Sequence, residues 1–218
     1  MEEIIERRPV LTAEDLHLLM QTTGAAAWND IPLAAEAGDL DELMLSSFLR
    51  LVEEGLIVPS GPEKYRVTEE ARELILPLKE PERKTLMLIH GGTAILYEKC
   101  GQQRVLLADP GGRTFRLGGT EDGAEELLSQ LGLPGDESCG TEETPTEIFS
   151  PDSDPNEIMK RSEALFIQTV RGGMIRRCAR VFAEGSAYWL SVPGSDRAPE
   201  RLEKEKLLNW IRQGEATA

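Results

Sequence analysis

The residues that most often catalyse reactions or bind metals are few in this chain and lie far apart. There are two histidines, His17 and His90, and three cysteines, Cys100, Cys139 and Cys178. No H-E-x-x-H or C-x-x-C motif occurs, so a zinc site would need ligands gathered from distant segments. We therefore expect neither a metal site nor a cofactor.

A cysteine nucleophile is the catalytic arrangement that these residue types would allow. Cys100 or Cys178 would attack the substrate, and His90 would act as the base. The alternative is that both cysteines are small apolar strand residues, since free cysteine is usually buried and unreactive. The chain also lacks the G-x-x-x-x-G-K-[ST] and G-x-S-x-G motifs. We favour the structural role for both cysteines and predict that the protein is not an enzyme.

Composition and charge exclude several classes of partner. The 218 residues include 39 Asp and Glu against 24 Lys and Arg, a net charge of −15. This charge opposes generic binding to nucleic acid and to anionic membranes. The chain has no apolar run of about 18 residues, the length that a membrane-spanning helix needs, and its N-terminus does not resemble a secretory signal. The odd number of widely spaced cysteines indicates a reducing compartment. We predict a cytoplasmic protein.

The first part of the chain predicts helix, helix, hairpin, helix. Thr12 and Asp15 have the spacing of a capping box at the start of the first helix. Apolar residues at helical spacing predict a second helix over 39–54. Two short apolar runs within 56–67 flank a Pro-Ser-Gly-Pro turn and predict a hairpin. A third helix is expected over 68–78.

This order resembles the helix–wing–helix part of winged-helix proteins, which would imply a transcriptional regulator with an α+β effector domain. Residues 1–80 hold 7 Lys and Arg against 17 Asp and Glu, a net charge of −10. In the would-be recognition helix, Arg50 is the only basic residue. A helix in the major groove lies between phosphates and needs cations. We therefore disfavour nucleic acid as a partner and keep the regulator as the alternative.

Two later segments each predict a run of strands followed by an amphipathic helix. Residues 81–133 predict four strands and a helix, and residues 161–218 predict three strands and a helix. We interpret them as a divergent repeat forming a quasi-twofold sheet, which gives an α+β fold. Between them, residues 134–160 hold eight acids and one lysine. Such a segment has too little apolar surface to bury to offset the entropy cost of ordering it. We expect an acidic linker there, with Ile148 and Phe149 as its docking side chains.

A basic strand is the main candidate site. Residues 160–214 hold 11 basic and 6 acidic residues, a net charge of +5. Strand alternation over 174–182 would place Arg176, Cys178 and Arg180 on one face. That face is either solvated or paired with the acidic linker, or it is a cationic surface that receives an acidic partner segment. The candidate partner-binding residues are Arg176 and Arg180.

The order of elements also resembles a known family. The motifs that carry it are V-L-T-A-E-D-L-H-L-L near the start, R-V-L-L-A-D-P-G-G-R-T-F-R-L in the middle and G-S-A-Y-W-L-S-V-P towards the end. They resemble the EspG family, cytosolic chaperones of type VII (ESX) secretion that bind PE–PPE-type helical substrates. The resemblance implies a quasi-twofold body whose sheet and flanking helices hold the apolar tip of a helical export substrate.

This resemblance makes a non-enzymatic, protein-binding adaptor or chaperone the first hypothesis for the function. A chaperone needs an apolar patch to cover its client and a charged exterior to keep the complex dispersed. Trp28, Ile31 and Phe149 are the loop residues that could form such a patch, and the alternative for each is a place in the core. The sequence leaves open whether the chain forms a homodimer.

Overall fold

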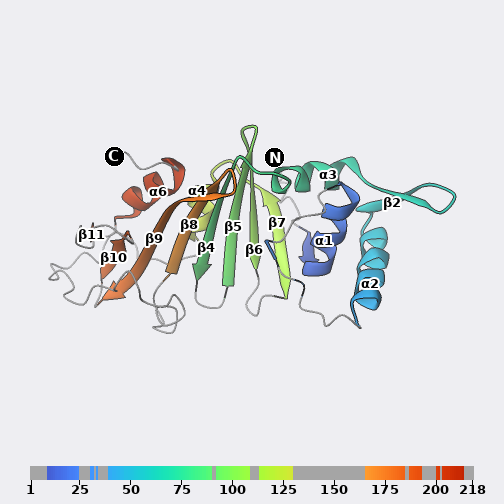
Figure 1. Ribbon diagram of the computed structural model, residues 1–218, viewed down its shortest axis with the longest axis horizontal. Coiled ribbons are helices and arrows are strands. Elements are labelled where there is room, and N and C mark those ends of the chain that lie inside the picture. The colour runs from blue at the N-terminus through green and yellow to red at the C-terminus, as the bar shows by residue number, and fades with distance from the viewer. Residues whose placement is uncertain are drawn as a thin grey trace, which may run out of the picture.

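The computed structural model describes most of the chain as strands and helices (Figure 1). The described residues are 9–24, 30–31, 33, 39–89, 92–108, 113–129, 165–184, 187–192, 200–201 and 203–213. Within them the chain forms a nine-stranded antiparallel sheet, a separate two-stranded hairpin and helices on both faces of the sheet. The predicted α+β class is confirmed. The predicted linker 134–160 lies outside the described residues.

Helices and strands follow one another in the order expected from the sequence, with two added strands. In chain order they are β1 (Val10–Thr12), α1 (Ala13–Thr22), α2 (Leu40–Glu53), β2 (Ile57–Gly61), β3 (Lys64–Val67), α3 (Glu69–Ile75), the 3₁₀ helix η1 (Leu76–Leu78), β4 (Arg83–Ile89), β5 (Gly92–Lys99), β6 (Gln102–Ala108), β7 (Thr114–Gly119), α4 (Gly123–Ser129), β8 (Leu165–Arg171), β9 (Met174–Glu184), β10 (Ala187–Ser191), β11 (Glu200–Arg201) and α6 (Lys204–Gln213). The strands of the large sheet lie in the order β1-β7-β6-β5-β4-β8-β9-β10-β11. The added strands, β1 and β11, lie at its two edges.

Strand β5 is buried on both faces of the sheet. Ile95 and Tyr97 contribute to one apolar core, whereas Ala94 and Leu96 contribute to the other. Because successive side chains of a strand point to opposite faces, the two cores lie on opposite sides of the sheet. The first core also includes residues of α1, and the second includes residues of α4 and α6. The sheet is therefore sandwiched between helices at this point.

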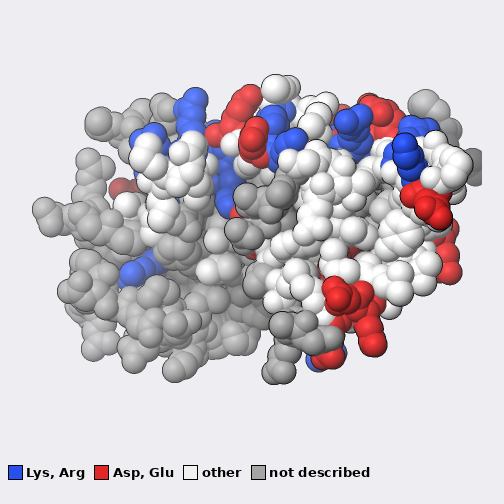
Figure 2. All heavy atoms as spheres, turned by 45° about the vertical axis from the view of Figure 1, so that its right-hand side comes forward, with Lys and Arg blue, Asp and Glu red and all other residues white. Residues whose placement is uncertain are grey.

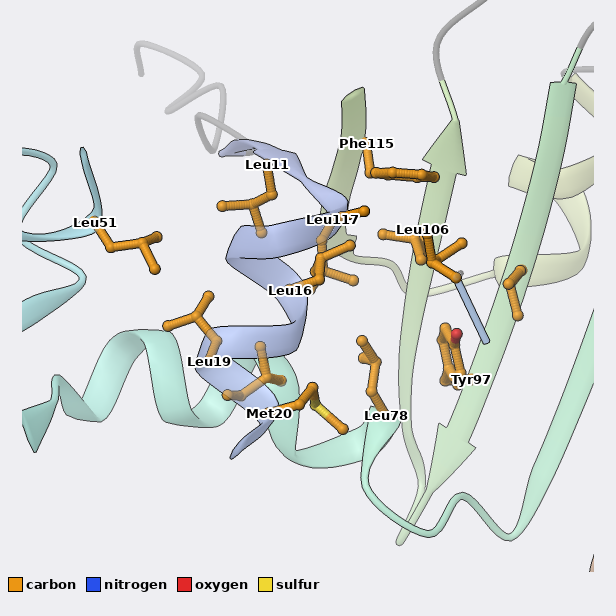
Figure 3. Packing of buried hydrophobic residues seen from close by; sticks show 14 of the residues in the cluster. Leu11, Leu16, Leu19, Met20, Leu51, Leu78, Tyr97, Leu106, Phe115 and Leu117 are labelled. Carbon is orange, nitrogen blue, oxygen red and sulfur yellow. The ribbon is translucent and has the colours of Figure 1, made fainter. Parts of the chain in front are cut away.

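The N-terminal helices share a core with strands β5 to β7. Figure 3 shows Leu16 and Met20 of α1 on the side of the sheet, where Leu106 and Leu117 lie, and Leu19 on the side of α2, where Leu51 lies. These side chains are almost fully buried. Each buried leucine side chain contributes about 2 kcal/mol to the stability of the fold. The segment predicted as a unit over 1–80 is thus joined to the sheet by a continuous apolar core.

The start of α1 confirms the predicted capping box. The Thr12 hydroxyl accepts a hydrogen bond from the Asp15 backbone N–H at 3.3 Å, and the Asp15 carboxylate accepts one from the Thr12 N–H at 2.7 Å. Arg50 of α2 donates to the same carboxylate and to the Thr12 hydroxyl. The hydrogen bond to Asp15 is the main reason why the pKa of Arg50 is raised. One carboxylate therefore caps α1 and ties it to α2.

The second half of the sheet differs from the prediction at its last helix. A strand that was not expected precedes this helix: Glu200 and Arg201 form β11, which pairs with β10 through Trp189 and Leu190. The helix α6 begins at Lys204. The short strand was not predicted because a two-residue pairing leaves no hydrophobic period to read.

Candidate protein-binding surfaces

The turn between β8 and β9 projects two apolar side chains into solvent. Gly172 and Gly173 have φ angles of +57° and +73°, a left-handed conformation that glycine adopts without strain. A Cβ at either glycine would meet no atom within 4 Å, so the turn is open to solvent on that side. Met174 and Ile175 follow directly and are 55% and 62% exposed. We call Arg171, Met174, Ile175 and Arg176 the β8–β9 tip.

A β-bulge in β9 changes the predicted alternation of the arginines. Ile175 pairs with Val170 and Arg177 pairs with Thr169, so Arg176 is an extra residue between two paired positions. A bulge of this kind re-aims side chains next to it. Arg176 is exposed, and so is Arg171 on the partner strand. The tip therefore combines apolar side chains with exposed positive charge.

The other two arginines of β9 lie within the protein body. The Arg177 guanidinium stacks over the Trp210 ring of α6 at 4.4 Å and donates to the Trp210 carbonyl at 3.1 Å. Its partial burial lowers its pKa. Arg180 is only 6% exposed. Of the two predicted partner-binding arginines, Arg176 thus presents its charge at the surface, whereas Arg180 offers little of its side chain to a partner.

The face of β9 that carries Arg177 is covered by α6. Ala179 and Val181 lie in the core to which Leu207 and Ile211 of α6 contribute. Strand alternation would place Ile175 on this face with Arg177, Ala179 and Val181, but the bulge separates it: Ala179 and Val181 pack with α6 and Arg177 stacks on Trp210, whereas Ile175 is exposed at the tip. The strand is therefore supported by α6 up to the bulge, and the tip extends beyond this support.

The two described cysteines lie in different environments. Burial is the main cause that raises the pKa of Cys178, and the Arg180 charge opposes it. A raised pKa disfavours the thiolate that a nucleophile needs. Cys100 is exposed next to a turn, with its Sγ atom 3.6 Å from the Glu82 carboxylate. The proposed base, His90, lies outside the described residues.

The described residues also hold no cluster suited to a metal ion, meaning three or more His, Cys, Asp or Glu side chains placed together. One open hollow of about 400 Å³ lies between α3 and the end of β7. Its Arg104 side chain donates to the backbone carbonyls of Gln103 and Glu73. The other charged groups that line the hollow are Glu54, Glu70 and Glu73. This set brings no nucleophile and base together.

A second exposed apolar surface covers the outer side of α2. Leu45 and Leu49 are 60% and 54% exposed, although Leu51 on the inner side is fully buried. Phe48 meets Tyr65 of β3 edge to face, with ring centroids 4.8 Å apart, and Tyr65 is half exposed. We call Leu45, Phe48, Leu49, Val52 and Tyr65 the α2 surface; of these, Phe48 and Val52 are partly buried and also pack against the first core.

The sequence contained a signal for this surface that the periodicity analysis did not use. Leu45 and Leu49 lie on the side of α2 away from the buried Leu51. A helix that packs on one side needs an apolar arc of roughly 100° or somewhat more. The apolar residues of α2 cover more of the helix than that. The excess indicates a second contact face.

Acidic side chains border the α2 surface. Asp41, Glu42 and Glu53 are all exposed, and α2 has two acids in its first turn. Figure 2 brings the side of α2 and the β2–β3 hairpin forward and shows a broad uncharged area with acidic groups at its lower and right margins and both basic and acidic groups along its upper margin. The α2 surface therefore has the opposite border charge to the β8–β9 tip.

The three loop residues predicted as an apolar patch, Trp28, Ile31 and Phe149, do not form an exposed patch within the described residues. Trp28 and Phe149 lie outside the described residues. Ile31 is buried in the core on the α1 side of the sheet, and its carbonyl accepts a hydrogen bond from the His17 Nε2 at 2.7 Å. Ile31 is thus a core residue, as its alternative interpretation held. In the described part of the chain, no helix is long and apolar enough to cross a membrane.

Comparison with known proteins finds a likeness in fold but none in sequence. No protein-family profile matches the chain, and no curated protein matches its sequence. Among solved structures, the fold is similar to that of the Mycobacterium tuberculosis type VII secretion system chaperone EspG5, solved in complex with the PE25–PPE41 dimer. The TM-score is 0.53 at 11% sequence identity, over 94% of each chain. The chain therefore has an EspG-like fold.

Proposed function

We propose that the protein is a non-enzymatic adaptor or chaperone that binds a helical protein client, of the kind exported by type VII secretion, in the cytoplasm. The observation that carries the proposal is the β8–β9 tip, where Met174 and Ile175 are both more than half exposed. The likeness of the fold to a chaperone that was solved with a bound protein dimer supports it. In this proposal the tip is the client contact.

The chemistry of the tip suits an acidic client segment with an apolar centre. Burying Met174 and Ile175 against a client would contribute about 1.5–3 kcal/mol for each side chain. Arg171 and Arg176 would attract acidic groups around that contact. Arg176 is the cleaner test of the two predicted arginines, because reversing the charge of the nearly buried Arg180 would also disturb the core.

The arrangement of strands supports a quasi-twofold body as part of this proposal. Strands β4 to β7 are followed by α4, and strands β8 to β11 are followed by α6. The two sets extend outward from an antiparallel pair, β4 and β8, at the centre of the sheet. In this proposal 81–133 and 161–218 are the related halves, and 1–80 is an added helical unit.

The experiment compares three forms of the full-length chain in capture of proteins from the native host. The first is the wild type, the second is M174E/I175E, and the third is the control L76E/V192E, which changes two exposed apolar residues elsewhere. Proteins that bind the wild type and the control but not M174E/I175E are then purified and titrated by calorimetry.

We expect a helical, acidic client whose affinity for M174E/I175E is about ten-fold lower, or more, than for the wild type. A fourth form, R176E, titrated with the same client, should bind it several-fold more weakly. A client that binds all three forms equally would remove the tip as the contact. If all forms of the chain fold normally and none of them binds any protein, the chaperone role is contradicted.

The alternative function is a winged-helix regulator. The observation in its favour is the β2–β3 hairpin, which projects from the body in Figure 1 and exposes Lys64 and Arg66. Against it, the acids of α2 would face phosphates. Tight, salt-sensitive shifts of genomic DNA fragments, lost in K64E/R66E, would favour the regulator. Light scattering on the same samples measures the molecular mass in solution and so tests whether the chain forms a homodimer.

A further inference from the structure

The α2 surface lies on a different element from the β8–β9 tip and has a different chemistry. We propose that it binds an amphipathic helix with basic flanking residues, supplied by another protein. This contact goes beyond the proposed function, because it is separate from the client contact and does not require it. The argument follows from the spacing of the apolar residues, from their surroundings and from the charges at the border.

The spacing of the apolar residues suits a helix. Leu45, Phe48, Leu49 and Val52 lie at positions i, i+3, i+4 and i+7, which form one continuous seam along α2. Such a seam offers the ridges and grooves into which the side chains of a second helix can pack. Tyr65 flanks the seam through its edge-to-face contact with Phe48. Aromatic side chains placed in this way are frequent anchors of protein interfaces.

The seam is held in a fixed position from its inner side. Leu51 is fully buried in the core, and the ion pair between Arg50 and Asp15 connects α2 to α1. The outer side chains therefore need little rearrangement on binding. A preformed helix face lowers the entropy cost that a partner must offset.

The border charges select the partner. Glu42 and Glu53 lie on the Leu49 side of the seam, at helical angles within roughly 40° of that of Leu49. The single basic residue of α2, Arg50, is committed to Asp15. Lys64 and Arg66 lie on the opposite face of β3 from Tyr65, because alternate residues of a strand point to opposite sides. A partner helix with Lys or Arg beside its apolar stripe would complement Glu42 and Glu53.

A second copy of this chain fits the surface less well. In an antiparallel pair of α2 helices, Glu42 of one copy would face Glu53 of the other. In a parallel pair, each glutamate would face its own counterpart. Both arrangements oppose like charges across an apolar interface, which costs affinity. The charges therefore favour a basic partner over self-association.

The test uses two synthetic helical peptides of the same length as α2, with leucines at i, i+3, i+4 and i+7. One peptide has lysine flanks and the other has glutamate flanks. Each is titrated with the full-length protein by fluorescence anisotropy. We expect the lysine-flanked peptide to bind about ten-fold more tightly than the glutamate-flanked one.

Variants of the chain locate the contact. We expect L45Q/L49Q to weaken binding of the lysine-flanked peptide about ten-fold, whereas the control L76Q/V192Q changes it less than about two-fold. E42K/E53K should reverse the preference between the two peptides, an outcome that a misfolded variant would not give. M174E/I175E should bind the peptide normally, which separates this contact from the client contact.

Three outcomes would overturn the inference. They are equal binding of both peptides, no binding of the lysine-flanked peptide, and full binding by L45Q/L49Q. A concentration-dependent dimer that L45Q/L49Q abolishes, measured by light scattering, would also overturn it, because that result would assign the surface to a second copy. None of these outcomes bears on the β8–β9 tip.

Discussion

The α2 surface and the β8–β9 tip both expose large apolar side chains, but acidic groups border one and basic groups border the other. Leu45 and Leu49 lie beside Glu42 and Glu53, whereas Met174 and Ile175 lie between Arg171 and Arg176. Apolar burial supplies affinity of similar size at both places. The border charge therefore decides which partner each surface accepts, and the comparison predicts two partners of opposite charge.

The two surfaces are exposed for different structural reasons. α2 is apolar on two sides: Leu51 is fully buried and Phe48 and Val52 pack against the core, whereas Leu45 and Leu49 stay more than half exposed. The β8–β9 tip is exposed because the glycine turn and the bulge at Arg176 carry β9 beyond the part that α6 covers. One surface is a rigid helix face, and the other is the end of a hairpin.

The largest expected effect contrasts the two sides of α2. L51A removes a fully buried side chain and should lower the free energy of unfolding by about 3 kcal/mol. L49A removes a half-exposed one and should change it by less than about 0.5 kcal/mol. Urea denaturation monitored by circular dichroism measures both. Equal losses would mean that Leu49 is part of the core and that the α2 surface is not free for a partner.

The next effect concerns the attachment of α2 to α1. D15A removes the carboxylate that accepts from the Thr12 N–H in the capping box and that pairs with Arg50, and it should cost about 2 kcal/mol. The cost is limited because Arg50 is partly exposed and can return to water. E42A on the exposed side of α2 is the control and should be near neutral. If D15A were as mild as E42A in the same denaturation experiment, the helix would not be anchored as described.

A smaller effect tests how well β9 is enclosed behind its tip. In a C139S background, Ellman's reagent at neutral pH should react about ten-fold more slowly with Cys178 than with Cys100. Cys178 is half-buried and burial raises its pKa, whereas Cys100 is exposed. Single Cys100→Ser and Cys178→Ser variants assign the two phases. Equally fast labelling of Cys178 would show that β9 opens readily and would revive a nucleophilic role.

The smallest effect depends on pH. The hydrogen bond from Arg212 of α6 lowers the pKa of Asp122, which precedes α4. A lowered pKa means that the stabilising contribution is complete above the ordinary pKa near 3.8 and is lost as the pH falls through the lowered value. Because the pair is exposed, its loss at acid pH should lower the melting temperature of the protein only slightly. D122N should lack this acid-dependent part, and an identical pH profile would contradict the contact.

Local sequence signals predicted the parts of the fold that depend on neighbouring residues. The capping pair Thr12 and Asp15 follows from chemistry within a few residues. The order of strands and helices followed from periodicity. These features required no knowledge of the tertiary structure.

Contacts between distant segments were not predictable in the same way. β1 pairs with β7 through Val10 and Leu11, about a hundred residues away in the sequence. The bulge at Arg176 depends on the register of β8 against β9. It separates Arg176 at the surface from Arg180 inside, although alternation alone had grouped them. Of the two arginines that the sequence proposed as partner-binding residues, only Arg176 lies at the tip.

The most direct test of the account is hydrogen exchange of the full-length protein with and without its purified client. Mass spectrometry would follow backbone amides over the whole chain. The account predicts that the client slows exchange at residues 171–177 and leaves α2 unchanged until a basic amphipathic helix is added. Protection confined to α3 and the end of β7, with none at the tip, would contradict it.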